Sequence, residues 1–202
     1  MILFAIYLMS CTNTEAQEII FFQKIKEVKI ESNNKIKTKK IGNYSGITTN
    51  YFLLENSMQL ITLVETKDTN LFLRNLTIST LLRNTSTKDS IIVKLFTISK
   101  DSLKPDDVIL KFSGTISDFY EKANQLKFKL LNSYLKIPEG GYFISLEYYP
   151  LNKKSYLALA LNKKNKVDVT LIKKRGDSKL KHLDYDKDEI YNLKTWFEAY
   201  IE

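Results

Sequence analysis

The stretch QLKFKLL, residues 125–131, decides the fold class. Leu126, Phe128 and Leu130 fall on one face of an extended strand, and the two lysines between them fall on the other. This period of two is typical of an antiparallel strand that packs one face on a hydrophobic core and leaves the other in water. The stretch therefore predicts a half-buried strand rather than a helix.

Short apolar runs of this kind recur along the chain, whereas helical periodicity is almost absent. Turn sequences rich in Asn, Asp, Gly and Ser separate the runs. We therefore predict an all-β fold, an antiparallel, jelly-roll-like β-sandwich with at most one or two short helices. The helix candidate is ISDFYEKAN, residues 116–124, with Ser117 or Asp118 as its cap. Strands are predicted at residues 25–31, 50–55, 58–67, 71–82, 90–99, 107–114, 125–131, 141–150, 155–162, 167–174 and 194–202.

The chain opens with MILFAIYLMSC, an uncharged run that ends in the only cysteine. The run is too short for a membrane-spanning helix, which needs ~20 residues, but it suits the apolar core of a signal peptide. Leu8-Met9-Ser10-Cys11 resembles a bacterial lipobox, which predicts cleavage before Cys11 and lipidation of its thiol. Small residues at Thr14 and Ala16 predict ordinary cleavage after Ala16 instead. A buried N-terminal strand or helix with an incidental cysteine is the third alternative.

We therefore expect residues 1–16 to be a signal segment and residues 20–202 to form a single β-sandwich domain. Of the 202 residues, 44% are hydrophobic, which is enough for a substantial core. One cysteine excludes an internal disulfide, so packing alone must stabilise the fold. The net charge of +8 comes from lysines scattered along the chain, which favours a solvated surface over a nucleic-acid interface.

The segment around GYFISLEYYP, residues 141–150, also carries a family resemblance. Lys94-Leu95-Phe96, Pro105 and the run Ile137–Glu147 occur in the order found in jelly-roll-like β-sandwich domains of exported Bacteroidota proteins. Ile41-Gly42 before Tyr51-Phe52 resembles the opening of these domains, so the resemblance covers about residues 36–150. In that family the domain often follows a carboxypeptidase-like regulatory domain, for which the stretch after the predicted signal leaves no room. The resemblance implies a fold and an envelope location, and it implies no catalytic residues.

Motifs for metal, nucleotide or nucleophilic chemistry are missing from the sequence. His182 is the only histidine, so we expect neither a histidine-based zinc site nor a catalytic dyad. The acidic loop DYDKDE, residues 184–189, lacks the glycine and the final glutamate of a calcium-binding loop, and we interpret it as a solvated loop. We therefore expect no cofactor and no metal site.

Two sets of side chains remain as candidates for function. Glu147 lies inside an apolar strand, where a carboxylate is costly unless it is bonded. It could be one acid of a carbohydrate hydrolase, which needs a second carboxylate across a cleft, or it could pair with a lysine. Tyr148, Tyr149, Tyr156 and Trp196 could stack on sugar rings, or they could pack within the sheets.

These patterns predict a non-catalytic, exported module of a bacterial cell envelope that binds a protein or a glycan. We expect it in the outer membrane or periplasm or at the cell surface, with membrane contact only through a lipid on Cys11. An envelope carbohydrate hydrolase that uses Glu147 is the first alternative. Polyanion binding through the lysine-rich stretch from Lys163 to Lys181 is the second.

Overall fold

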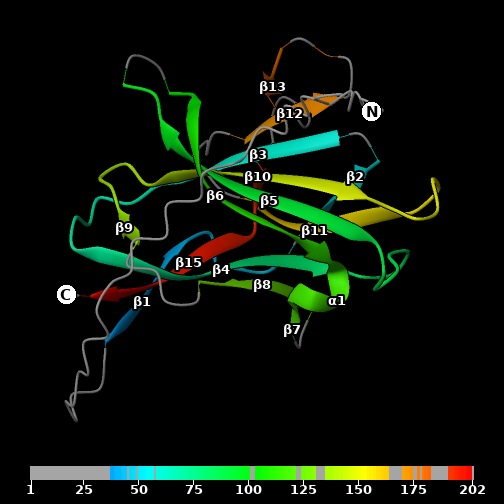
Figure 1. The fold of residues 1–202 in the computed structure, drawn as a ribbon, viewed down its shortest axis with the longest axis horizontal. Helices are drawn as coiled ribbons and strands as arrows, with labels where there is room; N and C mark the ends of the chain where they lie inside the picture. The colour runs from blue at the N-terminus through cyan, green and yellow to red at the C-terminus, as the bar shows by residue number, and fades with distance from the viewer. Residues whose placement is uncertain are drawn as a thin grey trace, which may run out of the picture. The chain divides into compact units, whose positions relative to one another are not determined.

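The computed structural model describes residues 37–44, 46–48, 50–56, 58–100, 103–121, 124–130, 135–163, 170–174, 177, 179–182 and 191–201, all within one compact unit, Lys35–Glu202. The described residues of this unit form two antiparallel β-sheets and one short helix, α1 (Ile116–Phe119) (Figure 1). The predicted all-β, antiparallel sandwich is therefore confirmed. No helix in the described part of the chain is long and apolar enough to cross a membrane.

The first sheet has six strands in the order β13-β12-β3-β10-β5-β6. Every neighbouring pair in it is antiparallel. Its strands are β3 (Met58–Val64), β5 (Ser90–Ile98), β6 (Pro105–Thr115), β10 (Tyr142–Tyr149), β12 (Thr170–Lys174) and β13 (Lys181–His182).

The second sheet has nine strands, with β1-β15-β4-β11-β14 as its main path. Strand β2 pairs with β11, while β8 and β9 pair with β4 and β7 pairs with β8. Its strands are β1 (Thr38–Gly42), β2 (Asn50–Glu55), β4 (Leu71–Leu81), β7 (Tyr120–Glu121), β8 (Gln125–Lys129), β9 (Leu135–Ile137), β11 (Tyr156–Lys163), β14 (Tyr191–Leu193) and β15 (Thr195–Ile201).

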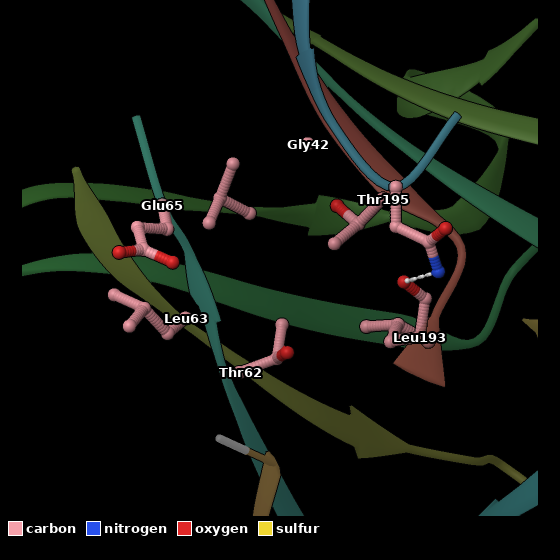
Figure 2. Close-up of a pocket in the computed structure, with 8 residues that line it drawn as sticks. Gly42, Thr62, Leu63, Glu65, Leu193 and Thr195 are labelled. Carbon is pink, nitrogen blue, oxygen red and sulfur yellow. Dashed lines mark hydrogen bonds between the residues drawn. The ribbon is translucent and has the colours of Figure 1, made fainter. Parts of the chain in front are cut away.

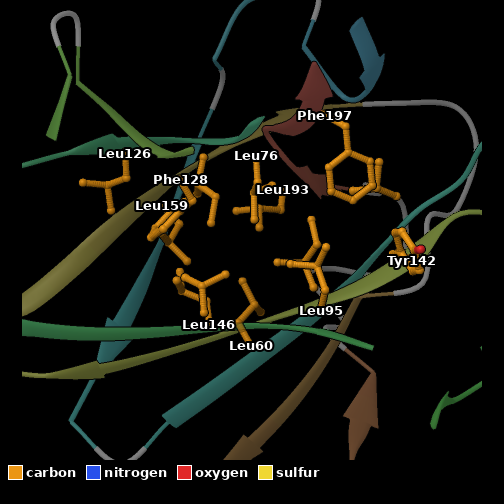
Figure 3. Packing of buried hydrophobic residues seen from close by; sticks show 14 of the residues in the cluster. Leu60, Leu76, Leu95, Leu126, Phe128, Tyr142, Leu146, Leu159, Leu193 and Phe197 are labelled. Atoms are coloured by element: carbon orange, nitrogen blue, oxygen red, sulfur yellow. The ribbon is translucent and has the colours of Figure 1, made fainter. Parts of the chain in front are cut away.

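The chain passes from one sheet to the other at most of its connections, for example from β2 to β3, from β3 to β4 and from β10 to β11. In Figure 1, β3, β10 and β5 accordingly lie above β4, β15 and β8. Alternating residues of both sheets point into the space between them and form the main core (Figure 3). Leu60 and Leu95 come from one sheet and meet Leu76 and Phe128 from the other. Each fully buried side chain of this kind contributes about 1.5–3 kcal/mol through the hydrophobic effect.

The turn before β10 requires glycine. Gly140 and Gly141 have φ of 90° and 89°, a region that residues with a Cβ rarely adopt. A Cβ on Gly141 would also collide with the backbone oxygen of Val64 at 1.9 Å. The two glycines of KIPEGG, residues 136–141, therefore allow the tight reversal of the chain before β10.

Two local expectations differ from the structure, and a third falls outside the described residues. The helix begins after Thr115 rather than at a Ser117 or Asp118 cap, and it ends at Phe119 because the chain turns extended at Tyr120. No strand was predicted between residues 31 and 50, but Thr38–Gly42 forms β1, in which only Ile41 is buried. The strand predicted at residues 25–31 lies outside the described residues, and the start of the domain at residue 20 stays a prediction.

Candidate functional site

The four aromatic residues chosen from the sequence do not form one exposed platform. Tyr148 and Tyr149 point to opposite faces of β10, so Tyr148 is 1% exposed and Tyr149 is 43% exposed. Tyr156 begins β11 in the other sheet, where its hydroxyl accepts a 2.7 Å hydrogen bond from Asn84. Trp196 on β15 is 5% exposed, with the Lys40 ammonium 5.5 Å from its ring centre. Ligand binding by any of the four stays a prediction.

Glu147 is surrounded by donors on the outer face of the six-stranded sheet. It accepts hydrogen bonds from Lys94 (2.7 Å), Tyr149 (2.6 Å) and Gln59 (3.3 Å). Partial burial raises the pKa of Glu147, but these bonds from Lys94 and Tyr149 and the charges of Lys94 and Lys111 lower it by more, so its pKa lies below the ordinary value of 4.5. The arrangement is that of an ion pair, the structural alternative considered from the sequence.

Asp89, the buried acid directly before β5, does not face Glu147. Asp89 is 0% exposed and accepts a hydrogen bond from Tyr148, whose side chain lies on the core side of β10. Glu147 projects from the opposite side of the same strand. The two carboxylates therefore do not flank a common cleft, as a pair of glycosidase acids would.

Several other candidates lie outside the described residues: Cys11, the acidic loop at residues 184–189 and the side chain of His182. In the described part of the chain no group of three His, Cys, Asp or Glu side chains could hold a metal ion. In the basic stretch from Lys163 to Lys181, the Lys181 ammonium lies 3.3 Å from the carboxylate of Asp177.

One hollow lies between the sheets where β3 approaches the β14–β15 junction (Figure 2). It encloses about 160 Å³ and is lined partly by Asn43, Thr62, Glu65 and Thr195. Its polar groups bond to the protein itself: the Asn43 side-chain amide donates to the backbone oxygen of Leu193 at 2.9 Å, and the Thr195 hydroxyl donates to the backbone oxygen of Thr77 at 3.0 Å. These bonds give the hollow a structural role in joining strands.

A second hollow has a different chemistry, and we refer to it as the Tyr120 hollow. It lies where β6, α1, β7 and β8 meet, and it has a volume of about 220 Å³. It combines aromatic rings with charged groups of both signs. The lining residues are Phe112, Asp118, Phe119, Tyr120, Glu121, Lys127 and Lys129.

The short helix α1 sets the shape of the Tyr120 hollow. The Asp118 carboxylate accepts hydrogen bonds from the backbone N–H of Thr115 at 2.7 Å and from its hydroxyl at 2.8 Å. These bonds hold the pKa of Asp118 below its ordinary value, because they favour the ionised form. Backbone bonds from Ile116 to Asp89 and from Ser117 to Thr87 fix the helix to the connection before β5.

Contacts between tilted aromatic rings hold the walls of the hollow. Phe128 is fully buried, and its ring centre lies 4.5 Å from that of Phe119 and 5.4 Å from that of Phe112. Tyr120 follows Phe119 directly and is 46% exposed. A rigid apolar wall therefore ends in an accessible aromatic ring.

The charged groups of the hollow are partly paired. The Lys127 ammonium lies 3.5 Å from Glu121 and 3.6 Å from Glu198 of β15. Lys129 is exposed and forms no ion pair with the described residues. The hollow thus offers carboxylate acceptors and an ammonium donor beside an exposed ring. The adjacent aromatic residues Phe119 and Tyr120 were the sequence feature that could have indicated this hollow. They lay inside the predicted helix and were not considered as binding residues.

Comparison with known proteins adds fold-level relatives only. No protein-family model and no curated protein matches the sequence. The structure of the clostridial cysteine protease Cwp84 after propeptide cleavage matches with a TM-score of 0.59 and 11% identity, over 82% of this chain and 40% of that one. A structure of the cysteine protease and lectin-like domains of Cwp84, a surface layer associated protein of Clostridium difficile, matches with a TM-score of 0.55 and 12% identity, over 82% and 36%. This chain thus spans less than half the length of either, and the likeness shows the fold.

Proposed function

We propose that this protein is a non-catalytic binding module and that the Tyr120 hollow binds a carbohydrate. The observation that carries the proposal is the exposed ring of Tyr120 beside the fixed Phe119 and Phe112 rings, with charged donors and acceptors around it. The C–H face of a sugar ring is apolar and stacks on such a ring, while its hydroxyls bond to carboxylates and ammonium groups.

The size of the hollow limits the ligand. Its volume of about 220 Å³ is below the ~300–1,000 Å³ of sites for drug-sized molecules, so it accommodates one sugar residue rather than a long segment. A single stacked residue with a few hydrogen bonds corresponds to a Kd on the order of 1 mM. Tight binding therefore requires several copies of the module or contacts beyond the hollow.

The structural relatives support the proposal at the level of the fold. One of the matched structures holds the cysteine protease and lectin-like domains of a surface layer associated protein, and the match covers 36% of that chain. The resemblance of residues 36–150 to exported Bacteroidota sandwiches agrees with a module of the cell envelope, which is part of the proposal.

Export is the second element of the proposal, with either a lipid on Cys11 or cleavage after Ala16. Intact mass and N-terminal peptide analysis of the protein from its own host tests it. A diacyl or triacyl mass on Cys11, or a chain that starts at Gln17, supports export. An unmodified chain that retains Met1 contradicts it.

An array of immobilised glycans tests carbohydrate binding, because many weak contacts on one surface raise the apparent affinity. Tyr120→Ala should abolish the signal of the wild-type protein. Tyr51→Ala is the matched control, since Tyr51 is also exposed, at 38%, and lies on β2, which pairs with β11. It should leave the signal unchanged. An array without any bound glycan, or binding that survives Tyr120→Ala, contradicts the proposal.

A further inference from the structure

The outer face of the nine-stranded sheet beside the Tyr120 hollow carries a cluster of cations, which we call the basic face. One row across β1, β15, β4 and β8 consists of Lys40, Glu198, Asn75 and Lys129 in register. The residues of the basic face are Lys40, Arg74, Lys127, Lys129 and Lys136, with Glu198 as the carboxylate among them.

Three of these lysines form a column along one edge of β4. Lys127 and Lys129 of β8 pair with Thr77 and Asn75, and Lys136 of β9 pairs with Phe72. Side chains two residues apart on a strand are spaced by about 7 Å. The three lysines therefore follow one another along the edge of β4, and Lys127 and Lys129 also line the Tyr120 hollow.

The positive charge of this face is only partly neutralised. Burial raises the pKa of Glu198, but the hydrogen bond from Asn75 and the charges of Lys127, Lys40 and Arg74 lower it by more, so this carboxylate stays ionised in the middle of the cations. Lys129 and Lys136 are exposed, and neither forms an ion pair with the described residues. Two ammonium groups are thus available to an anion.

Aromatic rings hold the remaining cations in place. The Lys40 ammonium lies 5.5 Å from the ring centre of Trp196, and the Arg74 guanidinium lies 5.3 Å from that of Tyr200. Such cation–π contacts fix the position of the charge without neutralising it. The face is therefore preorganised for a negatively charged ligand.

We infer that the ligand of the Tyr120 hollow is an acidic glycan, whose carboxylate, sulfate or phosphate groups bind the basic face while one of its rings occupies the hollow. The inference rests on the proposed function. Asp118 and Glu121 line the hollow, where they accept sugar hydroxyls, whereas Glu198 of the basic face is bonded to Asn75 and lies 3.6 Å from the Lys127 ammonium. Lys129 and Lys136, which form no ion pair with a described residue, lie along the adjoining column. Carboxylates in the hollow and ammonium groups in the column suit a ligand with a hydroxylated ring followed by anionic groups. They suit a nucleic acid less well, because its phosphates would be repelled by Asp118 and Glu121.

The experiment compares polygalacturonate with its fully methyl-esterified form, which has the same sugar chain without the charges. Binding is measured at low and high salt through the fluorescence of Trp196, the only tryptophan of the chain, which lies beside Lys40 in this face. The acidic polymer should bind at least tenfold more tightly than the ester, and salt should weaken it steeply, because exposed charges are screened.

Charge variants locate the binding. Lys129→Gln/Lys136→Gln should weaken polygalacturonate binding at least tenfold, and Lys129→Arg should retain it. Lys153→Gln/Lys154→Gln is the matched control, because it removes the same charge from the exposed turn before β11 and should change binding less than twofold.

The outcomes separate the two proposals. Equal binding of both polymers, abolished by Tyr120→Ala, overturns the acidic glycan and leaves carbohydrate binding in the hollow intact. No binding of polygalacturonate at low salt also overturns the inference, because this polymer combines hydroxylated rings with the carboxylates that the basic face should hold. Equally tight binding of single-stranded DNA, with the same loss in Lys129→Gln/Lys136→Gln, shows a general polyanion surface and also overturns it.

Discussion

The hydroxyl of Tyr148 donates a 2.5 Å hydrogen bond to the carboxylate of Asp89, and both side chains are buried. The same carboxylate accepts bonds from the backbone N–H groups of Ser86 at 2.8 Å and Leu151 at 2.9 Å. Asp89 therefore joins the connection before β5 to β10 and to the turn after it. The backbone oxygen of Asp89 also accepts from Ile116, so the same residue supports α1 and the Tyr120 hollow.

Removing this carboxylate should destabilise the fold. Asp89→Ala leaves three donors without their acceptor, and we expect the free energy of unfolding to fall by about 3 kcal/mol. Tyr148→Phe removes one donor and should cost about 1–2 kcal/mol. Tyr149→Phe is the control, because that hydroxyl lies at the surface, and should cost about 0.5 kcal/mol or less. Urea denaturation measures the free energy of unfolding of all three variants. Equal losses in Tyr148→Phe and Tyr149→Phe would contradict the prediction that the buried hydrogen bond contributes more than the exposed one.

The ion pair of Glu147 and Lys94 predicts a loss of stability in acid. The pKa of Glu147 is lowered in the folded state, so its contribution is present above the unfolded pKa near 4.5 and is lost as the pH falls through the folded value. At pH 7, Glu147→Gln should lower the free energy of unfolding by about 1 kcal/mol. At pH 3 the variant and the wild type should differ little. Urea titrations across this range check the prediction, and a difference independent of pH would contradict it.

The two glycines before β10 should respond unequally to the same substitution. Gly140→Ala places a Cβ 3.4 Å from the side chain of Ile98, so it costs mainly the positive φ, about 1–2 kcal/mol. Gly141→Ala adds a collision with the backbone of Val64, which cannot move without disturbing β3. We expect Gly141→Ala to cost clearly more in thermal and urea unfolding. Equal costs would mean that the turn relaxes easily.

The sequence predicted the long strands well because burial on one or both faces leaves a strong pattern. NYFLLE became β2 with the predicted bounds, and β4, β5 and β10 differ from prediction by a residue or two. The short strands β7, β9, β13 and β14 carry too few residues to show a period. The strand β1 was not predicted because most of its residues are exposed and show no alternation of apolar and polar side chains. Backbone pairing to β15 holds it in the sheet.

The candidate site was harder to predict because it depends on how distant segments meet. Adjacent tyrosines such as Tyr148 and Tyr149 must face opposite sides of a strand, but only the fold decides which of them is buried. The Tyr120 hollow joins residues 112–121 to residues 127 and 129 across two sheets. No local sequence pattern predicts that contact. The helix predicted over residues 116–124 included Tyr120, so the sequence did not indicate that its side chain is exposed.

The most direct test of carbohydrate binding in the Tyr120 hollow is a map of backbone amide chemical shifts by nuclear magnetic resonance. The isotope-labelled protein is titrated with the oligosaccharide that gives the strongest array signal. Our account predicts that the largest shifts fall on Phe119, Tyr120 and Lys129, and that Tyr120→Ala removes them. Shifts concentrated instead around Asn43 and Thr195, or around Glu147, would place the ligand elsewhere and contradict the account.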